Sequence, residues 1–164
     1  MKVLGVDPGL LITGYGIVDV AGRQIKLFEA GIIRSSPKQK LQDRLNQIYD
    51  NLISVIEEAS PEVAVIEKLY SHYKHPATAI LMGHVRGIVY LAVRKKKLAL
   101  FEYPPKRVRK AVVGRGGATK EQVARMVQAY LNLKQPPEPL DVSDALALAI
   151  AHAFISVGTP CRGR

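Results

Sequence analysis

Apolar and polar residues follow one another in a pattern that predicts three strands at the start of the chain. The segment from Lys2 to Asp7 is an apolar run that ends at an acid and is stopped by Pro8-Gly9, as in a buried strand. Residues 13–20 and 24–34 are rich in β-branched and aromatic residues, and a short turn separates them. Three consecutive strands of this kind favour an antiparallel meander.

Helical and extended patterns alternate after the meander. Apolar residues recur at steps of three and four from Leu41 to Ala59, which predicts an amphipathic helix packed on the sheet. Residues 63–66 are all apolar, as in a central parallel strand, and this run ends at Glu67. A second helix is predicted at 76–95. Its apolar stripe consists of Ala77, Ile80, Leu81, His84, Ile88 and Leu91.

The last third of the chain adds one strand and two helices. Residues 98–103 predict a strand that Pro104-Pro105 ends, and a glycine-rich loop follows at 114–117. Thr119 and Gln122 have the spacing of a capping box at a helix start. A final helix is expected from about Asp141. The whole order predicts an α/β protein whose mixed sheet, an antiparallel meander plus parallel strands, carries helices on its faces.

The length of the chain predicts a single domain. Its 164 residues are close to the ~150 typical of one domain, so we expect one domain over residues 1–155 and a flexible basic tail over 156–164. No apolar run reaches the ~18 residues that cross a bilayer, which excludes a membrane span and a signal peptide. Cys161 has no partner cysteine, so we expect no disulfide or thiolate zinc site and a cytoplasmic protein.

The charge of the chain predicts a polyanionic partner. Its net charge is +10, and the window 94–115 holds nine Lys or Arg residues against the single acid Glu102. Such clustering suits a phosphate backbone, although a solvated surface explains a generic basic run about equally well. The candidate DNA-binding residues of this window are Lys106, Arg107, Arg109 and Lys110.

Four acids form a candidate metal site. Asp7 and Glu67 end two predicted neighbouring strands, and ligands of open α/β sheets gather at such strand ends. Asp141 and Asp144 are three residues apart at a helix start, so they share one face of that helix. Two Mg²⁺ ions, or Mn²⁺ as a substitute, would neutralise such a cluster and catalyse phosphoryl displacement. Singly, each acid has a simpler interpretation; Asp141, for example, is typical of an N-cap.

Several motifs, taken in order, resemble the RuvC family of bacterial Holliday-junction resolvases. They span most of the chain, from Val3 to about His152. The motifs are Val6-Asp7-Pro8-Gly9 with Thr13-Gly14-Tyr15-Gly16, Ile66-Glu67 with Tyr70, Ala111-Val112-Val113-Gly114 with Gly116, and Asp141-Val142-Ser143-Asp144-Ala145-Leu146-Ala147.

This resemblance implies a ribonuclease H-like fold, a homodimer, and metal-dependent nicking of two opposed strands at a four-way DNA junction. The positions of the family's catalytic, metal-binding acids are occupied by Asp7, Glu67, Asp141 and Asp144. Tyr70 stands where the family usually has a phenylalanine that stacks on a base. Arg109 and Lys120 stand at positions of family lysines, and the family implies a RuvA and RuvB branch-migration complex as partner.

The remaining expectations concern the histidines and the dimer. His152 follows Asp141 by about 16 Å of helix rise, too far to share a metal, so we expect it to pack in the fold. His84, on the apolar stripe of its helix, is expected to be a satisfied interface histidine, and no chemistry is assigned to His72 or His75. A two-fold dimer matches the symmetry of a junction, with the helix 76–91 as the expected interface.

Three other interpretations remain open from the sequence. The chain could be a different ribonuclease H-like nuclease, related to the YqgF family or directed at RNA. It could be a kinase or actin-like ATPase, although those proteins need two such subdomains and this chain holds one. It could also be a non-catalytic junction-binding protein, which the presence of all four acids disfavours.

Overall fold

The computed structural model describes residues 1–68 and 76–157, which contain ten regular elements. In chain order they are β1 (Lys2–Asp7), β2 (Ile12–Ala21), β3 (Gln24–Arg34), α1 (Leu41–Ala59), β4 (Val63–Glu67), α2 (Pro76–Lys95), β5 (Ala99–Tyr103), α3 (Pro105–Val113), α4 (Lys120–Tyr130) and α5 (Leu140–Val157).

The strands form one mixed sheet in the order β3-β2-β1-β4-β5. β1 pairs with β2, and β2 with β3, in antiparallel fashion, whereas β4 pairs in parallel with both β1 and β5. This arrangement confirms the predicted meander followed by parallel strands. Because β1 and β4 are parallel neighbours, their carboxyl ends lie at the same edge of the sheet.

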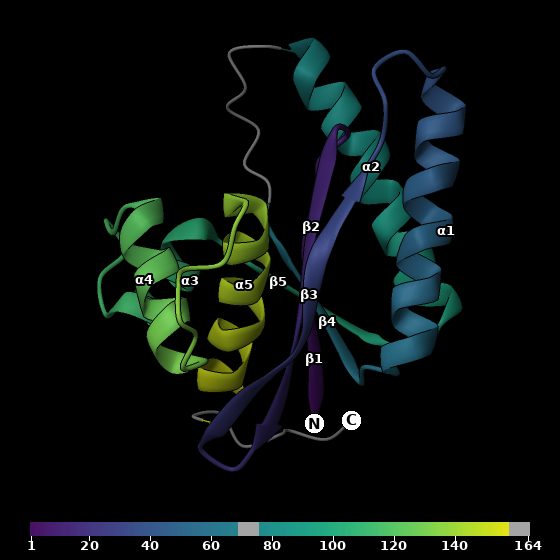
Figure 1. The fold of residues 1–164 in the computed structure, drawn as a ribbon. Helices are drawn as coiled ribbons and strands as arrows, with labels where there is room; N and C mark the ends of the chain where they lie inside the picture. The colour runs from purple at the N-terminus through teal and green to yellow at the C-terminus, as the bar shows by residue number, and fades with distance from the viewer. Residues whose placement is uncertain (69–75, 158–164) are drawn as a thin grey trace.

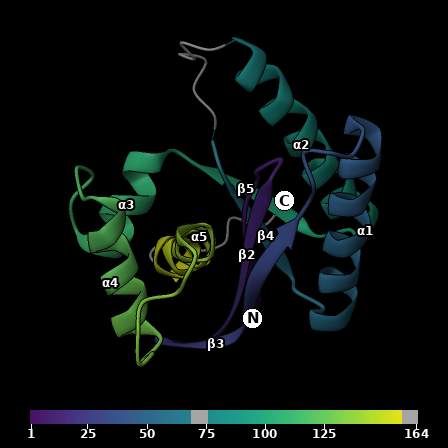
Figure 2. The same ribbon diagram turned by 45° about the horizontal axis from the view of Figure 1, so that its top comes forward.

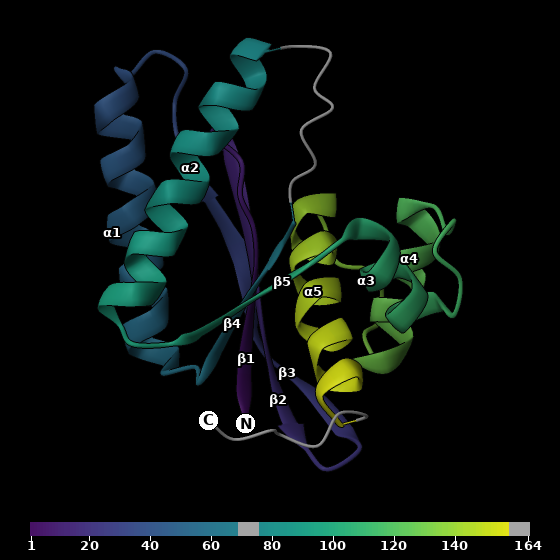
Figure 3. The same cartoon turned by 180° about the vertical axis from the view of Figure 1, so that it is seen from behind.

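Helices cover both faces of the sheet, as predicted. α1 and α2 lie on one face, and α5 lies on the other, with α3 and α4 packed on the outer side of α5 (Figure 1). The rotated view shows α5 nearly end-on between the sheet and the α3/α4 pair (Figure 2). Seen from behind, β5 crosses between the two helical layers and leads directly into α3 (Figure 3).

Alternate residues of each strand face opposite helical layers. Leu4 and Val6 of β1 pack in the core beneath α1 and α2, whereas Val3 packs in the core beneath α5. Since side chains alternate along a strand, Asp7 lies on the α5 face. The same alternation in β4 places Val65 in the α5 core and Glu67 on the α5 face.

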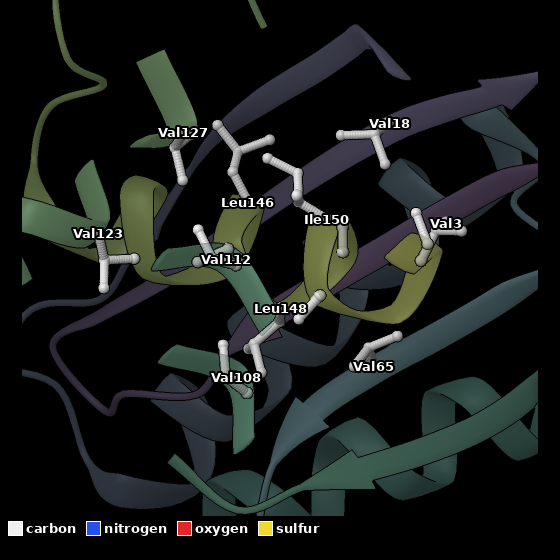
Figure 4. Packing of buried hydrophobic residues seen from close by; sticks show 14 of the residues in the cluster. Val3, Val18, Val65, Val108, Val112, Val123, Val127, Leu146, Leu148 and Ile150 are labelled. Atoms are coloured by element: carbon white, nitrogen blue, oxygen red, sulfur yellow. The ribbon is translucent and has the colours of Figure 1, made fainter. Parts of the chain in front are cut away.

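The core on the α5 side explains why this helix is apolar around its whole circumference. Figure 4 shows its side chains between those of the sheet, such as Val3 and Val65, and those of α3 and α4, such as Val112 and Val127. Every residue of α5 from Ala145 to Ala151 is buried. α5 is therefore the central layer of this half of the molecule, and its position relative to the sheet is tightly restrained.

The predicted apolar stripe of α2 is wrong. The fully buried residues of this helix are Val85, Val89 and Ala92, whereas Ile80 and Leu91 of the predicted stripe are 62% and 48% exposed. His84 of the same stripe is also exposed. α2 is apolar on more than one side, and a periodicity of 3.6 residues then does not distinguish the face that meets the sheet.

The structure also adds one helix and shifts the start of another. α3 was not predicted, although Pro105 in its first turn, the buried pair Val108 and Val112, and a left-handed Gly114 at its end are helix signals. The predicted capping box of α4 is confirmed. α5 begins at Leu140, so Asp141 lies inside its first turn, and the N-cap interpretation of Asp141 is wrong.

None of the helices in the described residues is long and apolar enough to cross a membrane.

Candidate functional site

Three acids from distant parts of the sequence line one small cavity. Asp7 ends β1, Glu67 ends the neighbouring β4, and Asp144 lies near the start of α5. The cavity measures about 100 Å³, and Arg109 of α3 and Lys120 of α4 also line it. The structure thus brings together residues that are up to 137 positions apart, at the sheet edge where parallel strands end.

Glycines in the sheet allow α5 to approach closely enough to deliver its acids. A Cβ atom added to Gly5 would lie 1.9 Å from the backbone oxygen of Ala145, and one added to Gly14 would lie 2.2 Å from the backbone oxygen of Asp141. Gly14 is also the cross-strand partner of Asp7. The helix backbone therefore lies directly on the sheet beside Asp7, because no side chain separates them.

Asp141 lies beside this cavity rather than among its lining residues. It is half-buried, and its negative charge contributes to the raised pKa of Asp7. The first two turns of α5 therefore carry two acids near the end of β1, and Asp144 has the larger effect on the pKa of Asp7.

The acids influence one another strongly. Burial, followed by the charge of Asp144, raises the pKa of Asp7 from 3.8 to about 7, and Asp141 and Glu67 add to this effect. Burial and Asp144 likewise raise the pKa of Glu67. Both shifts mean that the ionised carboxylates repel one another in a partly desolvated place, so positive charge at this site is stabilising.

Lys120 supplies part of that positive charge. Its Nζ donates a hydrogen bond to Oδ2 of Asp144, and this bond raises the pKa of the Lys120 ammonium group. Lys120 is the first residue of α4, and the capping box between Thr119 and Gln122 fixes this helix end. The charge of Lys120 also lowers the pKa of Asp7, so it interacts with acids from two elements.

The basic residues of α3 border the same cavity. Arg109 is half-buried and lowers the pKa of Glu67. Lys106, Arg107 and Lys110 are exposed because Val108 and Val112 occupy the buried side of the helix. The basic residues of window 94–115 therefore lie in different places. The first four lie at the end of α2 or just after it, and the next four lie on α3, beside the acids.

The donor set suits a hard divalent cation. In the described residues, no three His, Cys, Asp or Glu side chains are gathered closely enough to form a closed metal cage. Carboxylate oxygens whose mutual repulsion raises their pKa are nevertheless the ligands that Mg²⁺ prefers, and Mg²⁺ commonly completes its shell with waters and substrate phosphates. Open coordination of that kind fits the carboxylates of this site.

His152 is a packing residue, as predicted. It is 3% exposed, its Nδ1 lies 2.9 Å from the hydroxyl oxygen of Tyr103, and its ring centroid lies 4.6 Å from that of Phe101. Burial lowers its pKa, which favours the neutral ring. Tyr70, His72 and His75 lie outside the described residues.

Arg86 of α2 is a residue of the site region that the sequence did not point to. Its guanidinium group donates to the backbone oxygen of Glu67 at 2.5 Å. It lies 19 positions from Glu67 inside an apolar helix, and no spacing rule links an arginine of this kind to a distant carbonyl.

Known proteins match this chain over nearly its whole length. A family model described as Crossover junction endodeoxyribonuclease RuvC matches residues 3–152. The RuvC protein of Pelotomaculum thermopropionicum is 44% identical over 153 residues, or 93% of each chain. That of Alkaliphilus metalliredigens is 42% identical over the same share of each.

Solved structures agree with these sequence matches. A structure of T. thermophilus RuvC in complex with Holliday junction substrate is 33% identical, with a TM-score of 0.91 and 96% of both chains covered. A yeast mitochondrial Holliday junction resolvase shares the fold, with 13% identity and a TM-score of 0.66. The match covers 93% of this chain and 77% of the yeast chain.

Proposed function

The chain belongs to the RuvC family of crossover junction endodeoxyribonucleases, with its ribonuclease H-like fold and Holliday junction resolvase function, and on that premise we propose that its converging acids cut DNA with divalent metal ions. The proposed catalytic and metal-binding residues are Asp7, Glu67, Asp141 and Asp144. The observation that carries the proposal is the cavity at the ends of β1 and β4, which acids of three separate elements border.

The proposed chemistry is hydrolysis of a phosphodiester. Two Mg²⁺ ions, or Mn²⁺ in their place, would supply an activated water and neutralise charge on the scissile phosphate. The carboxylates at the ends of β1 and β4 and near the start of α5 would hold the cations. Lys120 donates a hydrogen bond to Asp144 and would place a positive charge beside a phosphate bound at the cavity. In the hydrolysis, water gives up a proton and its oxygen forms a bond to phosphorus, while the bond from phosphorus to the leaving sugar oxygen breaks and that oxygen takes up a proton.

The basic residues around the cavity are proposed to hold the DNA backbone. Lys106, Arg107 and Lys110 are exposed on α3, while Arg109 and Lys120 line the cavity itself. This division suits DNA binding, because the outer charges meet phosphates along the strand and the inner ones meet the scissile group. Tyr70 is proposed to stack on an unpaired base, which the family resemblance supports.

The dimer is proposed to form through α2. The face carrying Ile80, Gly83, Gly87 and Leu91 is exposed, and the two glycines have open space where a side chain would be. These positions share one side of the helix, so they offer an apolar surface that a second copy can approach closely. A homodimer would present two acid sites to a junction that is itself two-fold symmetric.

Sedimentation of the purified protein tests the dimer. We expect a two-chain species at micromolar concentration, and Leu91→Glu is expected to produce the 18 kDa monomer with separate rather than paired nicking of a junction. A wild-type monomer with full paired cleavage would contradict the proposal.

We also propose that the RuvA and RuvB complex is a partner, and faster cleavage of a junction preloaded with those proteins would support this.

A substrate comparison tests the proposed activity as a whole. The wild-type protein is incubated with a mobile four-way junction, a linear duplex and an RNA·DNA hybrid of matched sequence, with Mg²⁺ or with EDTA. We expect symmetrical nicks in the junction only when Mg²⁺ is present. Preference for the hybrid would indicate an RNA-directed nuclease, and binding without cleavage would indicate a non-catalytic junction-binding protein.

A further inference from the structure

Arg86 is the only Asp, Glu, Lys or Arg residue among the buried side chains of the described part of the chain, with 6% of its surface exposed. Removing a guanidinium group from water costs several kcal/mol unless it gains an anion and hydrogen bonds. A buried arginine therefore indicates a specific set of partners, and those partners show what it holds in place.

Two of the three partners of Arg86 lie at the ends of strands, and the third lies on α2 itself. Nη1 donates to the backbone oxygen of Glu67 at 2.5 Å, and Nη2 donates to Oε1 of Glu102 at 2.6 Å and to the hydroxyl of Tyr90 at 2.9 Å. The hydroxyl of Tyr90 donates in turn to Oε1 of Glu102 at 2.6 Å. Glu102 compensates the buried charge, and Tyr90 holds the carboxylate that does so.

The contact with Glu67 fixes the peptide plane that follows this residue. Glu67 is the last residue of β4 and pairs with Tyr103 of β5. The backbone N–H of Lys68 donates to the oxygen of Tyr103 at 2.8 Å, so one side of the plane is held by β5. Arg86 holds the other side through the Glu67 carbonyl. With both groups bound, the strand end has little freedom to rotate.

We infer that Arg86 is a positioning residue that keeps the Glu67 carboxylate in the acid cavity. The inference rests on the proposed role of Glu67 as a metal ligand. Glu67 and Asp144 repel each other across the cavity, and a strand end free to move would relieve that repulsion by turning Glu67 outward. Arg86 opposes this movement from the far face of the sheet, because α2 lies opposite α5. Among the described residues, the hydrogen bonds of Arg86 go to Glu67, Tyr90 and Glu102 and not to the basic residues of α3.

Two variants separate positioning from stability. Arg86→Leu combined with Glu102→Gln removes the contact with the Glu67 carbonyl but leaves no unpaired buried charge, and it conserves the net charge of the pair. Glu102→Gln alone keeps the contact with Glu67 but leaves the guanidinium without its anion. The single variant is therefore expected to be the less stable of the two, and the double variant the less active.

The readouts are thermal unfolding, Mn²⁺ binding by calorimetry in the absence of DNA, and junction cleavage. We expect the double variant to lose about tenfold in Mn²⁺ affinity and in kcat, as for other residues that orient metal ligands, with KM for the junction unchanged. Glu102→Gln is expected to unfold at a lower temperature yet keep its Mn²⁺ affinity and kcat. The double variant has the same net charge as the wild type. A loss of its Mn²⁺ affinity would therefore show that the Glu67 carboxylate has moved.

A Glu67→Gln variant separates failure of this inference from failure of the proposed function. If Glu67→Gln loses cleavage and Mn²⁺ affinity while the double variant keeps both, Arg86 is structural only and the positioning role is wrong. If Glu67→Gln itself binds Mn²⁺ and cleaves junctions like wild type, the proposed role of Glu67 fails, and the positioning role fails with it.

Discussion

The two faces of the sheet are built from alternate residues of the same strands, yet they differ in how the helices meet them. On the α1/α2 face, branched side chains such as Leu4, Val6 and Ile66 fill the space between helix and strand. On the α5 face, Gly5 and Gly14 leave no side chain in that space, and the helix backbone lies directly on the sheet. Side chains fill the whole α1/α2 face, whereas the α5 face combines packed side chains with glycines at the points where the helix backbone meets the sheet.

This difference shows why the acids lie on one face only. A helix held at an ordinary distance by large side chains would keep its first turn away from the end of β1. The close approach at Gly14 instead places Asp141 beside the strand that carries Asp7. We therefore expect changes on the α5 face to affect both stability and cleavage, and changes in the apolar core beneath α1 and α2, away from Arg86, to affect stability alone.

A matched pair of leucine truncations offers the largest test of this comparison. Leu52 of α1 and Leu146 of α5 are both fully buried, on opposite faces. Each change to alanine should cost about 2–5 kcal/mol of unfolding free energy. Urea unfolding measures this cost, and junction cleavage is measured per folded molecule at low temperature. Only Leu146→Ala should slow cleavage, because α5 carries two of the acids; equal cleavage by both variants would contradict the comparison.

The pH dependence of stability gives the next largest effect. The pKa of Asp7 is raised from 3.8 to about 7 in the folded protein, so the folded state holds this proton more tightly than the unfolded chain does. Without metal, the contribution of Asp7 to stability is therefore lost as pH rises from about 4 to about 7, by up to ~4 kcal/mol.

Urea unfolding in EDTA checks this sign. Asp7→Asn should be more stable than wild type at about pH 8, and the difference should shrink toward about pH 5. Adding Mg²⁺ at the higher pH should stabilise wild type more than the variant, because the cation replaces the missing proton. A wild-type protein that gains stability over this pH range in EDTA, relative to Asp7→Asn, would show that Asp7 is not in a repulsive cluster.

A substitution at Gly14 tests the close approach itself. Gly14→Ala places a methyl group against the Asp141 carbonyl and should cost about 1–3 kcal/mol of stability, as overpacking does. Cleavage by the folded fraction should also fall, because α5 must move away from β1. Thermal unfolding and a cleavage assay measure the two effects, and a variant with normal values of both would show that α5 has room to shift without harm.

The smallest expected effect concerns the DNA surface. Lys110→Ala on α3 should weaken junction binding and reduce the slope of log affinity against log salt by about one. Lys26, which is exposed on β3, is a matched control, and Lys26→Ala should leave the slope unchanged. Binding measured across a salt series distinguishes the two, and equal slopes would move the DNA surface away from α3.

The sequence was sufficient to predict the sheet but not all of its packing. Strand ends at Asp7 and Glu67 were visible because an apolar run stops at an acid, and the resulting mixed sheet is confirmed. The capping box at Thr119 was visible because its signal is local. The buried face of α2 could not be predicted, because this helix is apolar on several sides. Only the tertiary structure determines that Val85 and Val89 face the core.

Features that depend on the distance between elements could not be predicted from the sequence. Gly5 and Gly14 looked like ordinary strand glycines, because nothing local shows that a helix backbone will lie against them. The contact from Arg86 to the Glu67 carbonyl joins two elements whose side-by-side placement only the folded sheet defines. α3 has local helix signals, but its segment is short and lies between prolines and glycines, which favour a loop.

Cleavage of a mobile four-way junction by Asp7→Asn, measured beside wild type across a Mg²⁺ titration, tests the central claim most directly. The acids are proposed to act together on metal ions, so this variant should bind the junction as tightly as wild type while its nicking rate falls by about a thousandfold or more. Nicking at the wild-type rate with the wild-type Mg²⁺ dependence would show that the cavity at the ends of β1 and β4 is not the catalytic site.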